Sequence, residues 1–159
     1  MDRVLTWMES SAPAHFVVDN SWVFPTLETL HFIGLILLFG SMCMIDLRFM
    51  GFARHIPREA VLRFIPVALL GFLINLTTGI LFLFSDPFRY YPNLSFRLKM
   101  LAVLLAGLNA IWFKFVLGPG TPSLGNSGNP GPLLKAIAAL SLLLWTSVIV
   151  LGRMIPYLE

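Results

Sequence analysis

Four apolar segments, each long enough to cross a lipid bilayer, constrain this chain more than any other feature of its sequence. A membrane-spanning helix needs about 20 predominantly apolar residues, and the four segments cover residues 22–45, 64–84, 98–117 and 133–155. Backbone polar groups within lipid must be satisfied inside the spanning segment, so each one is expected to be α-helical. The sequence therefore predicts an all-α protein, a four-transmembrane-helix up-down bundle that forms a single integral membrane domain over residues 1–159.

Composition and motifs exclude several classes of protein. The chain is 57% hydrophobic and only 12% charged, whereas about a quarter of the residues in a soluble domain are charged. The net charge of +3 does not indicate nucleic-acid binding, because the basic residues are scattered over loops and helix ends. The sequence has no nucleophile with its base, no glycine-rich phosphate loop and no zinc-protease motif. We therefore assign no catalytic residue and do not expect an enzyme.

The segments outside the four spans predict how the chain meets the membrane. Residues 1–20 carry a short amphipathic patch around Arg3–Ser11, which we expect to lie on the membrane surface as a helix. The tract at 118–132 is rich in Gly, Pro, Ser and Asn and predicts a flexible loop. Six basic residues flank the first and third loops against five on the opposite side. This weak bias places both termini outside, which is the periplasm for a multi-pass protein of the bacterial inner membrane.

Glu28 and His31 form an ionisable pair inside the first apolar segment. A charged group there costs roughly 2.5–3.5 kcal/mol on insertion scales, so such residues usually face the bundle interior and serve a function. Residues three apart on a helix share one face. The carboxylate and the imidazole are therefore placed to share one proton, one metal ion or one hydrogen-bond network, and both are candidate metal ligands.

Basic residues at the same end of the bundle are the expected partners of this pair. Arg97, Lys99 and Arg153 lie near the outer ends of the third and fourth spans. A buried ion pair of Glu28 with Arg153, or with Lys99 as second choice, follows from these depths. A purely structural alternative is that these groups only neutralise and orient one another.

A second set of polar residues lies toward the opposite, inner side. Its members are Asp46, Arg48, Lys114 and Asn109. We expect Asp46, Arg48 and Lys114 to form a more solvated cluster, and Asn109 to hydrogen-bond between helices. Other polar residues inside the spans, such as Thr78, Ser141 and Trp145, are interpreted as partners in interhelical hydrogen bonds.

Blocks of residues along almost the whole chain, from Trp7 to Tyr157, resemble a bacterial family of small four-span integral membrane proteins of unknown function. The blocks are Pro25-x-x-Glu28-x-x-His31-x-x-Gly34, Asp46-Leu47-Arg48, Thr78-Gly79, Phe96-Arg97-x-Lys99, Leu108-Asn109, Ser141-Leu142-x-x-x-Trp145 and Gly152-Arg153-x-Ile155-x-Tyr157. This resemblance implies a topology and a shared polar constellation, without an activity. More distantly, the layout is similar to the membrane domain of CopD-like copper-resistance proteins and to four-helix b-type cytochromes.

Three functions are compatible with these residues. The first is a subunit of a membrane redox or metal-handling system, in which His31 ligates haem b, with Arg97, Lys99 and Arg153 at the propionates, or copper together with Glu28. Because His31 is the one histidine inside a span, a second haem ligand is absent, is water, or is His31 of another copy. The expected protein partners are therefore further copies in a homo-oligomer or other membrane subunits. The second function is a small proton-coupled transporter, since imidazole titrates near neutral pH. The third is a structural or anchoring subunit without a ligand.

Overall fold

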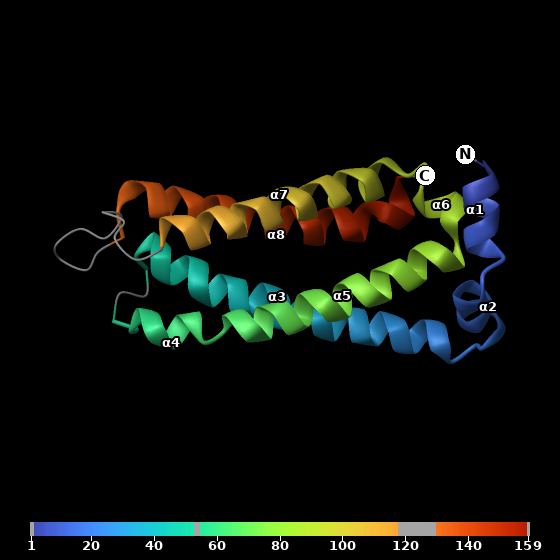
Figure 1. Ribbon diagram of the computed structural model, residues 1–159, viewed down its shortest axis with the longest axis horizontal. Helices are drawn as coiled ribbons and strands as arrows, with labels where there is room; N and C mark the ends of the chain where they lie inside the picture. Colours follow the sequence, from blue (N-terminus) through green and yellow to red (C-terminus); the bar gives the residue numbers. More distant parts are fainter. Residues whose placement is uncertain (1, 53–54, 118–129, 159) are drawn as a thin grey trace.

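Four long helices make up most of the molecule. The computed structural model describes residues 2–52, 55–117 and 130–158, and within these ranges it contains no strand. The long helices are long and apolar enough to cross a membrane, and their bounds are α3 Val23–Met50, α5 Ile65–Ser85, α7 Leu94–Val116 and α8 Pro132–Met154 (Figure 1). The expectation of an all-α bundle of four potential membrane spans is confirmed.

Local sequence signals explain where the long helices begin and end. The Asn93 side chain accepts a hydrogen bond from the Phe96 N–H at 3.1 Å and so caps the start of α7. Helix α3 ends at Met50, and the φ of 100° at the next residue, Gly51, lies in the left-handed region that favours glycine. The Phe52 N–H then reaches back to the Leu47 carbonyl at 3.1 Å. This stop lies beyond the predicted end at residue 45, because the polar residues that end the apolar run do not end the helix.

Five short helical segments lie at the two ends of the bundle, and their bounds are α1 Asp2–Glu9, α2 Ala12–Asp19, α4 Arg58–Leu62, α6 Pro87–Tyr90 and the 3-10 turn η1 Ile155–Tyr157. Helices α1, α2 and α6 and the turn η1 gather at one end, hereafter the terminal end, and α4 lies at the other, hereafter the α4 end (Figure 1). Helix α1 corresponds to the helix expected around Arg3–Ser11, and α2 is a second short helix that the sequence did not indicate. The predicted flexible loop falls mostly at residues 118–129, outside the described ranges.

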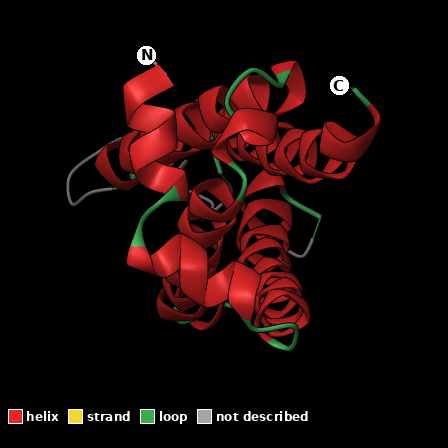
Figure 2. Cartoon of the chain, turned by 90° about the vertical axis from the view of Figure 1, so that its right-hand side faces the viewer, coloured by secondary structure: helices red, strands yellow, loops and turns green. Residues whose placement is uncertain are grey.

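The four long helices pack as two antiparallel hairpins. Helix α3 packs along α5, α7 packs along α8, and α3 also packs on α8 and so joins the hairpins. Figure 2 shows the bundle from its terminal end. The predicted contact between the first and fourth spans is confirmed. Within the described residues, α5 has no extensive contact with α7 or α8. The α3–α8 interface is therefore the main connection between the hairpins.

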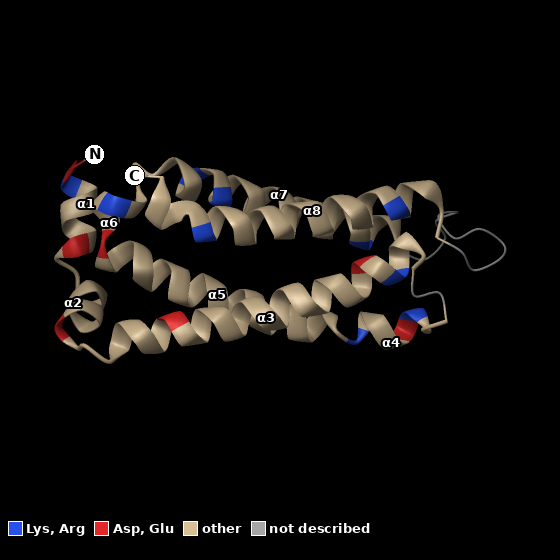
Figure 3. Cartoon of the chain, turned by 180° about the vertical axis from the view of Figure 1, so that it is seen from behind, with Lys and Arg blue, Asp and Glu red and all other residues tan. Residues whose placement is uncertain are grey.

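Two features show which surfaces face inward. One apolar cluster contains Leu38, Ala106 and Trp145 near the middle of the bundle, and a second contains Phe49 and Leu134 toward the α4 end. Many leucines of the long helices are instead exposed, as expected for a lipid-facing surface. Charged residues are concentrated toward the two ends of the bundle (Figure 3). This distribution fits helices that cross a bilayer.

Candidate functional site

His31 lies between α3 and α5 and is oriented by a hydroxyl group. Its Nδ1 atom lies 2.6 Å from the Thr78 Oγ1 atom of α5. The Thr78 hydroxyl donates its own proton to the Ile74 carbonyl at 2.8 Å, so it accepts the proton carried by Nδ1. His31 is therefore assigned the tautomer in which Nε2 has a lone pair. That nitrogen makes no hydrogen bond within the described residues, which leaves it able to accept a proton or to bind a metal.

Small and aromatic residues shape the surroundings of the ring. The Phe82 ring centroid is 5.7 Å from that of His31, with a 59° angle between the planes. Gly79 lies beside the imidazole, and a Cβ atom added there would be 3.8 Å from His31 Cε1. The sequence indicated that Thr78 makes an interhelical hydrogen bond, and the structure confirms this. The sequence did not indicate that the partner of Thr78 is His31.

Lys99 of α7 lies in the other hairpin and packs on α8. Its side chain lies against Gly152 of α8, where an added Cβ atom would be 3.3 Å from Nζ and 3.6 Å from Cε. Its ammonium group acts electrostatically on the His31 ring. Within the described residues Lys99 forms no salt bridge. Lys99, which packs on α8, thus lies within electrostatic range of His31 on α3, and this cation has no carboxylate partner among the described residues.

The predicted direct salt bridge of Glu28 is not formed. Among the described residues, the ion pair present is His15–Asp19, at 3.7 Å on the exposed face of α2. Glu28 is exposed, because the buried face of α3 runs through Leu27, Gly34 and Leu38. Within the described ranges, Glu28 also makes no hydrogen bond to His31. The depth of Glu28 along α3 allows a salt bridge, but the side chain lies on the exposed face of the helix and so does not form one.

Arg153 and Tyr90 are two further ionisable residues at the terminal end. The Arg153 guanidinium lies 5.6 Å from the centroid of the Tyr157 ring, an arrangement that favours the cation. Arg97 is exposed on α7. Burial raises the pKa of the Tyr90 phenol; the Arg89 charge opposes this increase, while those of Asp86 and Glu28 add to it. Glu28 is therefore close enough to α6 to act on Tyr90, a neighbour that the sequence did not indicate.

The donor set of this region is poor for a protein-bound metal ion. Among the described residues, no three side chains of the His, Cys, Asp and Glu types lie together as a possible metal site. Cys43 is a free thiol on α3, half a helix away from His31 in sequence. The interpretation of Glu28 and His31 as a copper site thus lacks further ligands within the described ranges.

The inner polar set separates into two parts. Asp46 is 2% exposed and accepts a hydrogen bond from the Ser141 hydroxyl of α8. Asn109 is 5% exposed and donates from Nδ2 to the Ile137 carbonyl of α8 at 3.1 Å. Asp46 and Asn109 therefore meet the same turn of α8. The expectation of a solvated cluster is wrong for Asp46, whereas Asn109 makes the interhelical hydrogen bond expected of polar residues inside the spans.

The two basic members of that set point elsewhere. Arg48 is buried, and its Nε atom donates to the Ile56 carbonyl, which ties the end of α3 to the segment before α4. Lys114 is exposed in the last turn of α7. Neither forms a salt bridge with Asp46 within the described residues.

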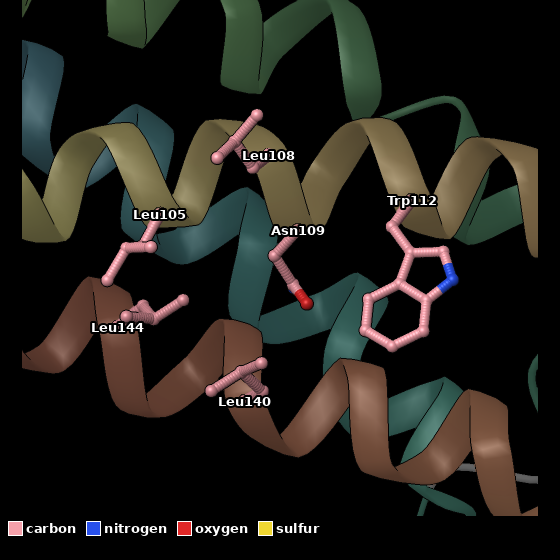
Figure 4. Close-up of a pocket in the computed structure, with 6 residues that line it drawn as sticks. All are labelled: Leu105, Leu108, Asn109, Trp112, Leu140 and Leu144. Carbon is pink, nitrogen blue, oxygen red and sulfur yellow. The ribbon is translucent and has the colours of Figure 1, made fainter.

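A shallow groove runs between α7 and α8 on the surface of the second hairpin. Asn109 lies at its floor, and the other lining residues are Leu105, Leu108, Trp112, Leu140 and Leu144 (Figure 4). Because the lining is apolar and Leu108 and Trp112 are exposed, the groove faces the lipid.

Comparison with known proteins bears on the family alone. No curated protein and no solved structure gives a significant match to this chain. The distant likeness to CopD-like proteins and b-type cytochromes is therefore not shown. One family model matches residues 4–158, with the description "Family of unknown function" (DUF6644). The chain belongs to this family.

Proposed function

We propose that this membrane protein binds an anionic ligand between its two hairpins, in the half of the bundle near the terminal end. The observation that carries the proposal is the Lys99 ammonium, which lies on Gly152 and acts on His31 without a salt bridge among the described residues. An unpaired charge within a membrane-spanning bundle is costly. A carboxylate on a bound ligand relieves this cost.

His31 gives the site its second recognition element. Its Nδ1–H group is held by Thr78 at 2.6 Å, and metal-binding imidazoles are usually oriented by such a hydrogen bond on the other nitrogen. The combination of an oriented imidazole, a nearby cation and apolar walls fits haem b better than a lone metal ion. Haem b has two carboxylates, an apolar ring, and iron that binds imidazole.

We therefore propose haem b as the ligand and a membrane redox subunit as the function. When bound, this cofactor supplies a one-electron redox centre within the membrane. His31 would hold it through Nε2, Lys99 and Arg153 would bind its carboxylates, and water or His31 of a second copy would supply a second ligand. The bacterial inner membrane, with both termini in the periplasm, is the proposed location.

Absorption spectroscopy on the detergent-purified protein tests this function. Haem added to the wild-type protein is expected to give a Soret band typical of histidine ligation. His31→Ala should abolish that spectrum, whereas His15→Ala, on the exposed face of α2, should leave it unchanged. Lys99→Met should weaken haem binding about tenfold, as expected for the loss of about 1.4 kcal/mol. Lys114→Met, at the other end of the same helix, is the matched control.

Iron-free protoporphyrin separates the two parts of the proposal. If it binds the wild-type protein and depends on Lys99 but not on His31, the anionic site is supported and haem ligation is wrong. If neither haem nor the porphyrin binds, and His31→Ala only lowers the unfolding temperature, the structural interpretation of this site replaces the proposal.

A further inference from the structure

Two buried oxygen atoms in the half of the bundle near the α4 end have no hydrogen-bond donor among the residues that the structure describes. They are Oδ2 of Asp46 on α3 and Oδ1 of Asn109 on α7, and each is enclosed without a hydrogen-bond partner. Buried polar atoms are almost always paired, so two unpaired acceptors in one region require an explanation. Neither residue belongs to the site around His31 and Lys99.

The same turn of α8 brings the two side chains together. Asn109 Nδ2 donates to the Ile137 carbonyl, and Ser141 donates to Asp46. Residues 137 and 141 are joined by one helical hydrogen bond, because an α-helix pairs each N–H with the carbonyl four residues earlier. The carboxyl group and the amide therefore approach one helical turn from the α3 side and the α7 side.

Apolar layers isolate this position from water on both sides. Toward the α4 end it is followed by the cluster of Ile45, Phe49, Leu134 and Ala138. Toward the middle of the bundle it is followed by the cluster that includes Leu38, Ala106 and Trp145. A carboxylate in such a place loses its hydration, and an ionised carboxylate buried without a partner is far more costly than a neutral acid.

The charged and titratable groups nearby do not supply a counter-charge. On α3 itself, Cys43 is a free thiol and Arg48 donates to Ile56. On α7 and α4, Lys114 and Glu59 are exposed. Lys135 of α8 is half-buried and precedes Ser141 on that helix. None of them forms a salt bridge with Asp46 among the described residues.

We infer that Asp46 is a proton-binding site, in which the neutral carboxylic acid donates its Oδ2–H to Asn109 Oδ1. One bound proton then satisfies both unpaired acceptors, while Oδ1 of Asp46 keeps the hydrogen bond from Ser141. The bond also connects α3 directly to α7, and so adds a second link between hairpins that otherwise meet mainly along α3 and α8. Removal of the proton breaks this link and leaves a carboxylate facing an amide oxygen.

Infrared spectroscopy of the full-length protein in nanodiscs tests the inference. At neutral pH we expect a carboxylic-acid C=O stretching band that shifts in deuterated buffer and is lost in Asp46→Asn. The matched control Glu59→Gln, which removes an exposed carboxylate of α4, should retain the band. In Asn109→Leu the band should move to higher frequency, because the acid loses its acceptor.

A second measurement does not depend on the folding of the Asn109 variant. Asp46→Asn replaces the neutral acid with an amide that makes the same donation. Because an unfolded aspartate releases its proton at about pH 4, the unfolding midpoint of the wild type should fall as the pH rises from about 4 through neutral, whereas that of Asp46→Asn should change less over the same range. Absence of the band from wild-type protein at neutral pH, or its persistence in Asp46→Asn, refutes the site. If replacing potassium by sodium removes the band and raises the midpoint, the oxygens bind a cation and the proton assignment is wrong.

Discussion

Replacement of Gly71 by alanine should separate the two helices of the first hairpin. A Cβ atom at Gly71 would lie 2.5 Å from the Leu38 nitrogen and 2.6 Å from the Gly34 carbonyl oxygen. Both are backbone atoms, so no side chain can rotate away. Restoring the 3.4 Å of an ordinary contact requires α3 and α5 to move apart by about 0.9 Å. A gap of that size forfeits about a quarter to a half of the local dispersion energy.

The expected magnitude follows from two opposing effects. Overpacking typically costs about 1–3 kcal/mol, and two rigid backbone contacts place this case at the upper end. Alanine also gains up to about 1 kcal/mol over glycine within a helix. The net loss should therefore be about 2 kcal/mol. Gly40→Ala on α3 and Gly107→Ala on α7 are matched controls, because nothing lies within 4 Å of an added Cβ atom at either position, and they should be neutral or slightly stabilising.

Reversible unfolding in detergent mixtures, followed by circular dichroism, measures this difference. The Gly71→Ala midpoint should fall well below those of the two controls. If Gly71→Ala is as stable as Gly40→Ala, α3 and α5 do not approach each other as closely at Gly71 as the structure shows, and the reasoning is refuted.

Two further predictions concern the terminal end. Asn93→Ala should lower the free energy of unfolding by about 2–3 kcal/mol, since it removes the α7 cap and two 2.9 Å hydrogen bonds to the carbonyls of Ile155 and Leu158. Asn93→Ser keeps a capping oxygen and should therefore lose less stability. Equal losses in the two variants would contradict this account. Because burial raises the pKa of the Tyr90 phenol in the folded protein, the unfolded chain releases this proton first, and stability should fall as the pH rises above about 10. Tyr90→Phe should show a shallower alkaline fall in its unfolding midpoint, and an unchanged fall would show that other groups dominate.

The sequence was sufficient to predict the four spans because hydropathy over 20 residues is a strong signal and lipid allows few alternatives. It also placed the first span beside the fourth and indicated that Thr78 and Ser141 hydrogen-bond between helices. The end of α3 was harder to predict, since Asp46 and Arg48 interrupt the apolar run while the helix continues to Gly51.

Side-chain partners were predicted less well, for a geometric reason. Depth along a helix follows from residue number, but the direction of a side chain depends on how the helix is rotated and tilted against its neighbours. Glu28 has the correct depth for Arg153 and the wrong direction, while His31 turns toward α5. Asp46 was placed with charged neighbours, yet its partner is the hydroxyl of Ser141, a contact that depends on the α3–α8 interface.

The two-hairpin arrangement has a consequence for how the protein is assembled in the membrane. The contact of α3 with α5 at Gly34 and Gly71 is complete within the first half of the chain, so this pair can insert and close before α7 is synthesised. The second pair then has one principal surface to find, the face of α3 that carries Leu38 and Ile45. Substitutions on that face should therefore leave insertion and hairpin closure intact while preventing the halves from docking. Two separately expressed halves would recombine through the same surface.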